Sequence, residues 1–103
     1  MGMGVDVHGG DYTKAARRAV SDALRHSSLN FFVAAGKERD DMNVEVRVAV
    51  SKPEQIDVDA IAEEVPYGTV TITPVQGGLD VPAPNSTDLM VIANAAILVS
   101  FPE

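Results

Sequence analysis

The segment "DLMVIANAAILVSF", residues 88–101, decides the fold because it is the most apolar segment of the chain. Its apolar residues occupy both sides of an extended backbone, whereas a strand with one solvated face alternates apolar with polar residues. We therefore expect a final strand in the middle of the sheet, covered on both faces. Asn94 lies inside it, and a buried amide needs hydrogen-bond partners in the neighbouring structure or in a bound ligand.

Three shorter strands are expected before this one. Residues 2–8 alternate between apolar and other residues and then run into a glycine turn. Residues 44–50 carry valine at every second position, which is the strongest strand pattern in the chain. Residues 69–75 form a third strand, and Pro74 places it at an edge of the sheet because proline has no N–H to donate. Residues 76–87 are expected to be a long loop.

Two helices are expected between the strands. The first begins at an N-cap formed by Asp11 or Thr13, and its sheet-facing side is a stripe of mostly small residues at helical spacing. The stripe consists of Ala15, Ala16, Ala19, Val20, Ala23 and Leu24. The second helix is short, spans residues 58–65 and is capped by Asp57.

The order β-α-β-α-β-β within residues 1–103 predicts one domain of the two-layer α+β class. Right-handed crossovers make the first three strands parallel. We expect a mixed four-stranded sheet in the order 1-4-2-3, with strand four antiparallel and both helices on one face. The other face then needs a cover, and another copy of the chain is the natural candidate, which predicts a homo-oligomer.

Composition limits the partners of the protein. The formal net charge is −7 and the chain has no cysteine, which argues against nonspecific binding to nucleic acid or to an anionic membrane and excludes thiolate chemistry. The longest apolar run, residues 89–99, is too short to span a bilayer. Because no signal peptide is visible, a cytoplasmic protein is expected.

The N-terminal stretch "GMGVDVHG", residues 2–9, contains a GxGxDxHG signature. It resembles the motif that defines a small family of uncharacterised proteins found in bacteria and, in longer forms, in plants. The segments "QGGL" (76–79) and "VIANAA" (91–96) are also similar to that family. Relatives usually carry several residues ahead of the motif, whereas this chain starts almost at it. The family has no established reaction, so the resemblance indicates a location rather than a chemistry.

The order of the elements resembles that of the chorismate-mutase-like fold. That resemblance implies a trimer with ligands held between subunits. It is an analogy of topology and does not identify a substrate or a cofactor.

The glycine turn before the first helix has two interpretations. It can leave backbone N–H groups free to bind an anion at the helix N-terminus, with Lys14 adding charge. Alternatively, Gly9 and Gly10 only supply the positive φ of a tight turn. On the first interpretation the ligand-binding residues are Gly4, Gly9, Gly10, Thr13 and Lys14, and the ligand is a small polar or anionic metabolite.

Asp6 and His8 lie two residues apart on an extended segment and point to the same side. A carboxylate beside an imidazole can form a general base, so both are candidate catalytic residues. The pair can also ligate a metal or make a purely structural hydrogen bond. The acid–base interpretation outranks the metal because the chain contains only one other histidine, His26.

Two further residues are candidates for binding a ligand. Arg47, on the polar side of the second strand, can bind a carboxylate or phosphate with two hydrogen bonds. An ion pair with Glu45 is the alternative, and residues two apart on one strand are a poor geometry for it. Asn94 is the second candidate. Three functions therefore remain open: an acid–base enzyme, a metabolite-binding module, and an assembly protein in which the motif is only a turn.

Overall fold

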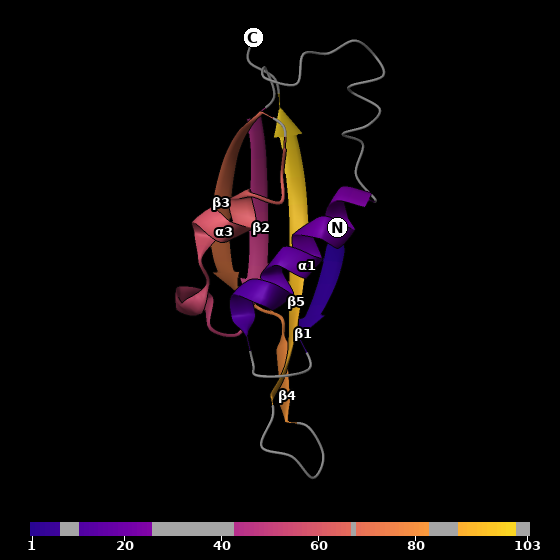
Figure 1. Ribbon diagram of the computed structural model, residues 1–103, viewed down its shortest axis with the longest axis vertical. Coiled ribbons are helices and arrows are strands. Elements are labelled where there is room, and N and C mark those ends of the chain that lie inside the picture. Colours follow the sequence, from indigo (N-terminus) through magenta and orange to yellow (C-terminus); the bar gives the residue numbers. More distant parts are fainter. Residues whose placement is uncertain (7–10, 26–42, 67, 83–88, 101–103) are drawn as a thin grey trace.

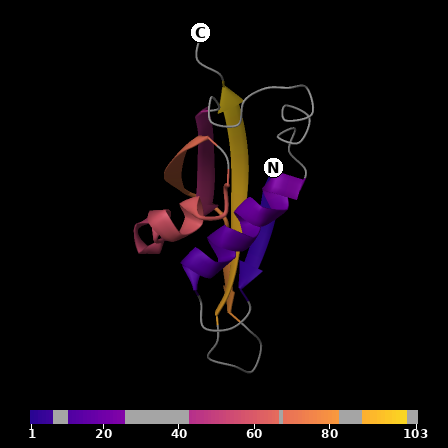
Figure 2. The same ribbon diagram turned by 45° about the horizontal axis from the view of Figure 1, so that its top comes forward.

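The computed structural model describes residues 1–6, 11–25, 43–66, 68–82 and 89–100. Within these residues the elements follow in the order β1 (Gly2–Asp6), α1 (Tyr12–Arg25), β2 (Asn43–Val50), the 3-10 turn η2 (Pro53–Gln55), α3 (Val58–Ala62), β3 (Thr69–Gln76), β4 (Leu79–Pro82) and β5 (Leu89–Ser100). Both α-helices lie on the same side of one sheet, which gives two layers (Figure 1). The turned view in Figure 2 separates the helix layer from the strands behind it. The α+β class is confirmed.

The sheet has the order β1-β5-β2-β3. The long strand β5 is antiparallel to both β1 and β2, and β2 is parallel to β3. The predicted order is therefore confirmed, with β5 as the central fourth strand of the prediction. Within the described residues β3 pairs only with β2, so Pro74 lies on an edge strand as expected.

One strand was not expected. Residues 76–87 were predicted to be a loop, but β4 pairs antiparallel with β5, with Leu79 opposite Ile92. Gly77 N–H donates to Val50 O at 2.9 Å, and Gly78 has a φ of +65°. A Cβ at Gly78 would lie 2.3 Å from Ile92 O. The two glycines therefore let the chain step from the line of β3 to the edge of β5, just beyond the end of β2.

The core lies between the sheet and α1. Alternate residues of β2 are buried, namely Val44, Val46, Val48 and Val50, and they share this core with Val91, Ala93 and Ala95 of β5. The predicted stripe of α1 is buried from Ala15 to Ala23, and Leu24 packs at its margin. Apolar residues at every second position of the strands therefore pack against apolar residues spaced about 3.6 apart on the helix, and together they form one core layer.

The first two glycines of the motif lie directly under α1. A Cβ on Gly4 would lie 2.2 Å from both Ala15 O and Ala19 N, and a Cβ on Gly2 would lie 2.2 Å from Ala23 N. No side chain fits in these two places while the helix stays where it is. The alternation of glycine in β1 therefore fits the alanine side of α1 and lets the two backbones approach closely.

The short helix α3 begins as expected and ends earlier than expected. The Asp57 carboxylate accepts hydrogen bonds from the N–H groups of Asp59 and Ala60. The helix stops at Ala62 instead of residue 65, and Val65 N–H bonds to Ala62 O in a tighter turn. Pro66 explains the early end, because the residue before a proline disfavours the helical region.

The sheet face away from the helices is open in the single chain. In the described residues Leu98 is 45% exposed and Met3 is 56% exposed on this face, and Asn94 is also exposed. Coverage of this face of β5, and with it the burial of Asn94, was expected from another copy of the chain and stays a prediction. The predicted extension of the first strand to residue 8 and the segment 29–41 lie outside the described residues.

Candidate functional site

Asp6 is the last residue of β1 and is buried, with an exposed fraction of 2%. Its Oδ2 accepts a hydrogen bond from Asp11 N–H at 2.9 Å, which ties the end of the strand to the residue that precedes α1. Its Oδ1 lies 3.9 Å from Lys14 Nζ and 3.7 Å from Arg18 Nη1. Asp6 is thus a buried anion flanked by two cations of the helix, which is the environment that a buried carboxylate requires.

The start of α1 is held by two side chains. Asp11 Oδ1 accepts from Lys14 N–H at 3.0 Å, so Asp11 is the N-cap. Thr13 Oγ1 accepts from Asp57 N–H at 2.9 Å, which joins the first turn of α1 to the cap of α3. The sequence left Asp11 and Thr13 as alternative N-caps of α1. The structure shows that Asp11 is the cap and that Thr13 instead accepts a hydrogen bond from the segment that begins α3.

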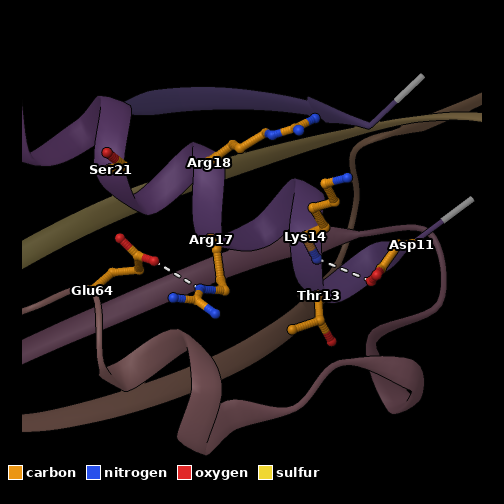
Figure 3. Close-up of a pocket in the computed structure, with 7 residues that line it drawn as sticks. All are labelled: Asp11, Thr13, Lys14, Arg17, Arg18, Ser21 and Glu64. Carbon is orange, nitrogen blue, oxygen red and sulfur yellow. Dashed lines mark hydrogen bonds and ion pairs between the residues drawn. The ribbon is translucent and has the colours of Figure 1, made fainter. Parts of the chain in front are cut away.

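The outer side of α1 carries the basic residues and borders a shallow hollow of about 470 Å³. Figure 3 shows the side chains that line it, Asp11, Thr13, Lys14, Arg17, Arg18, Ser21 and Glu64. Arg17 Nε donates to Glu64 Oε1 at 2.7 Å, and this bond raises the pKa of the guanidinium. Two cations of the hollow, Lys14 and Arg18, are the ones that flank Asp6.

The free edge of β1 is also covered by α1. Met3 N–H donates to Asp22 Oδ2 at 3.0 Å, and Arg18 Nη1 donates to Val5 O. Side chains of the helix thus occupy backbone groups that an edge strand would otherwise offer to another strand. Arg18 therefore lines the hollow and also donates a hydrogen bond to the edge strand β1.

A second polar cluster lies on the sheet side of α1. Tyr12, which is 5% exposed, donates from its hydroxyl to Asp80 Oδ2 at 2.5 Å, and Ser51 Oγ donates to the same oxygen at 2.5 Å. The hydrogen bond to Asp80 raises the pKa of the Tyr12 phenol, while the contact with Ser51 lowers it by less. The sequence did not point to these residues, because they come from three distant segments.

The predicted site residues are only partly brought together. Gly4, Asp6, Thr13 and Lys14 lie around the junction of β1 and α1, with Gly4 under the helix. His8, Gly9, Gly10 and His26 lie outside the described residues.

Arg47 and Asn94 lie on the face of the sheet away from the helices, opposite Ala96 and Ala49. Arg47 Nε donates to Glu45 Oε1 at 3.0 Å. The expectation that residues two apart on this strand pair poorly is therefore wrong, because the long arginine side chain reaches back along the strand.

No group of three or more histidine, cysteine or acidic side chains in the described ranges is arranged to hold a metal ion. Likewise, the helices that the structure describes include none long and apolar enough to cross a membrane.

The fold and this geometry define a small two-layer α+β protein whose first helix packs on glycines of the first strand. The chain belongs to the family of conserved hypothetical proteins described as Lin0512_fam, whose model matches residues 1–99. Membership in a family of uncharacterised small proteins is thus confirmed. That the GxGxDxHG motif defines this family, and the likeness to the chorismate-mutase-like fold, stay predictions.

The chain is also similar to a protein of known structure. It is 38% identical to an FtsZ-like protein of unknown function from Nostoc punctiforme PCC 73102, and its fold matches that crystal structure with a TM-score of 0.80. The likeness covers 95% of this chain and 88% of that chain. A search of curated proteins gave no match.

Proposed function

We propose that this protein binds a small anionic metabolite in the hollow on the outer side of α1, a hollow that begins at Asp11, the residue before the helix. The observation that carries the proposal is the gathering of three cations, Lys14, Arg17 and Arg18, around one hollow in a chain whose net charge is −7. A basic patch on an acidic protein attracts anions locally, and arginine binds carboxylate and phosphate groups with two parallel hydrogen bonds.

The hydroxyls of Thr13 and Ser21 border the same hollow and add donors suited to an anion. Asp11 and Glu64 border it as well, and both carboxylates are engaged, Asp11 with the backbone N–H of Lys14 and Glu64 with Arg17. Because Glu64 pairs with Arg17, Lys14 and Arg18, each about half exposed, are the cations most open to a ligand. In this proposal Asp6 has a positioning role, because it is buried beneath Lys14 and Arg18 and orients both.

Acid–base catalysis by Asp6 and His8 is an extension of the same proposal. It requires a ligand whose proton His8 can exchange while Asp6 sets the orientation of the imidazole. His8→Ala tests this extension separately, since that variant should abolish turnover of a bound substrate and leave the binding of a simple anion in place.

Isothermal titration with inorganic phosphate at constant ionic strength tests the binding proposal. Replacing Lys14 or Arg17 with glutamine should weaken phosphate binding by about three- to tenfold each, the size expected for losing one exposed charge-assisted bond. Arg25→Gln is the matched control, because Arg25 lies on the same helix and pairs with Asp22 outside the hollow. Equal losses of phosphate affinity in all three variants would mean that only the net charge of the protein matters, and would refute a site at the hollow.

A second candidate function is assembly through the open face of the sheet. It is favoured by the large apolar side chains exposed there, Met3, Val75, Leu79 and Leu98. Burying such a face against another copy removes apolar area from water. A closed homo-oligomer, with a trimer favoured by the topological resemblance, is the form we propose.

Assembly would also change the place of Arg47 and Asn94. Both lie on the open face, so in an assembly they would line a site between copies rather than the hollow on α1. Light scattering at micromolar concentration tests the assembly, and Leu98→Lys should dissociate it. Val58→Lys, which changes a residue of α3 that is 39% exposed on the helix side, is the control. A monomeric wild-type protein would refute this candidate.

A further inference from the structure

The cluster of Tyr12, Ser51 and Asp80 joins the first residue of α1, the residue after β2 and the middle of β4. β4 holds Asp80 opposite Val91, and β1 holds Asp6 opposite the same residue on the other side of β5. The cluster therefore lies beside the end of β1, under the start of α1. It is on the opposite side of the helix from the basic hollow, so it stands independently of the proposed anion site.

One carboxylate oxygen of the cluster has no partner. Both hydroxyls donate to Asp80 Oδ2, whereas Asp80 Oδ1 is buried and accepts no hydrogen bond from the part of the chain that the structure describes. A buried acceptor without a donor is costly, and such groups in native proteins are ordinarily satisfied. The two hydroxyls fix the orientation of the carboxylate and leave its second oxygen without a donor.

The chemistry of the cluster selects the kind of ligand. Tyr12 and Ser51 have each used their only O–H on Asp80, so what remains is acceptor capacity on Asp80 Oδ1 and on the two hydroxyl oxygens. A negative charge surrounded by acceptors excludes anions and favours a cation with several N–H donors. A metal ion is less suited, because no set of three metal-ligating side chains is found among the described residues.

We propose that Tyr12, Ser51 and Asp80 form a second binding site, which takes the primary ammonium group of a small ligand. Asp80 Oδ1 accepts one N–H of the ammonium, and the hydroxyl oxygens of Tyr12 and Ser51 accept the others. Asp80 is partly exposed as a residue although this oxygen is buried, so in this proposal the ligand approaches from the surface beside β4 and binding shifts the groups that cover the oxygen.

Methylammonium chloride is the probe, and tetramethylammonium chloride is its matched control, because it has the same charge and no N–H. Saturation-transfer NMR on the ligand methyl groups should detect binding of methylammonium and not of tetramethylammonium. Methylammonium should also raise the melting temperature. Equal signals from the two ions, no signal from either, or stabilisation by Mg²⁺ in place of methylammonium would each overturn the proposal.

Variants locate the binding. Asp80→Asn should weaken methylammonium binding by about tenfold or more, since the charge that attracts the ammonium is lost. Tyr12→Phe keeps the buried ring and should weaken binding less. Asp59→Asn, an exposed acid on α3, should leave binding unchanged. Thermal melts of each variant establish that it is folded, and unchanged binding in a folded Asp80→Asn protein would place the ammonium elsewhere.

Discussion

The two faces of the sheet are built from the same strands and differ in what covers them. On the helix side, residues such as Val46 and Val48 of β2 are fully buried under α1. On the open side, Glu45 and Arg47 of the same strand meet solvent as an ion pair. Because side chains alternate along a strand, one face of the sheet forms the core that stabilises the fold, and the other face is exposed to solvent and to binding partners.

Substitutions on the covered face should lower the free energy of unfolding more than substitutions on the open face. Gly4→Val places side-chain atoms where Ala15 O and Ala19 N already lie, 2.2 Å from the ideal Cβ. Because these are backbone atoms, the helix must move, and we expect a loss of about 3 kcal/mol or more in the free energy of unfolding. Urea denaturation measures it. Met3→Val, one residue away on the open face, is the control, and equal stability of the two variants would contradict the packing of α1 on β1.

A matched pair of valines compares the faces directly. Val48 is fully buried, while Val75, on the neighbouring strand, is 38% exposed on the open face. Val48→Ala should cost about 2 kcal/mol, because it removes two methyl groups from a packed core and leaves a cavity. Val75→Ala should cost well under half of that. A large cost for Val75→Ala that depends on protein concentration would show that another copy covers the open face.

Tyr12→Phe removes one hydroxyl from the covered face and leaves the ring in place. We expect a loss of about 1 kcal/mol at neutral pH, the size of one hydrogen bond. The pKa of Tyr12 is raised above its ordinary value of 10.0 in the folded protein, chiefly by the hydrogen bond to Asp80. The native state therefore keeps a proton that the unfolded chain releases, and stability should fall as the pH rises from 10 through the raised pKa. Denaturation at pH 9 to 11 should show this decline in the wild type and a smaller one in the variant.

The smallest effect is expected on the open face. Arg47→Gln breaks the ion pair with Glu45, in which Arg47 is 57% exposed. An exposed pair contributes about 0–0.5 kcal/mol, so the free energy of unfolding should hardly change. Chemical denaturation at low and at high salt checks this. A loss above about 1 kcal/mol would mean that the pair is buried in an assembly.

The sheet could be predicted because its strongest determinants are local. The apolar segment that became β5, the alternating valines of β2 and Pro74 each restrict the position of one strand, and together they leave one order. The strand β4 could not be predicted in this way. Its four residues carry little pattern, and its place depends on a backbone step at Gly77 and Gly78 that only the neighbouring strands explain.

For the candidate site, the sequence indicated a place in the fold and did not indicate which contacts form there. The motif drew attention to the junction of β1 and α1, where Asp6 is engaged with Asp11, Lys14 and Arg18, and a ligand site at this junction stays a prediction. The packing role of Gly2 and Gly4 has a signal that could have revealed it, since Ala15, Ala19 and Ala23 recur every fourth residue along the helix that must cover them. The cluster around Asp80 has no such signal, because its members meet only after the sheet forms. Glu45 and Arg47 pair through side-chain reach, which the spacing of backbone positions does not capture.

The central claim is that an anion binds on the helix side of the protein and not on the open face of the sheet. The open face has its own hollow, lined in part by Glu45, Thr71 and Leu98, and the helix side has the basic one. Titrating phosphate into ¹⁵N-labelled protein and following the backbone amide signals locates the bound anion. The account predicts shifts at Thr13, Lys14, Arg17, Arg18, Ser21 and Glu64. Shifts confined to the open-face hollow, or none at phosphate concentrations up to tens of millimolar, would contradict it.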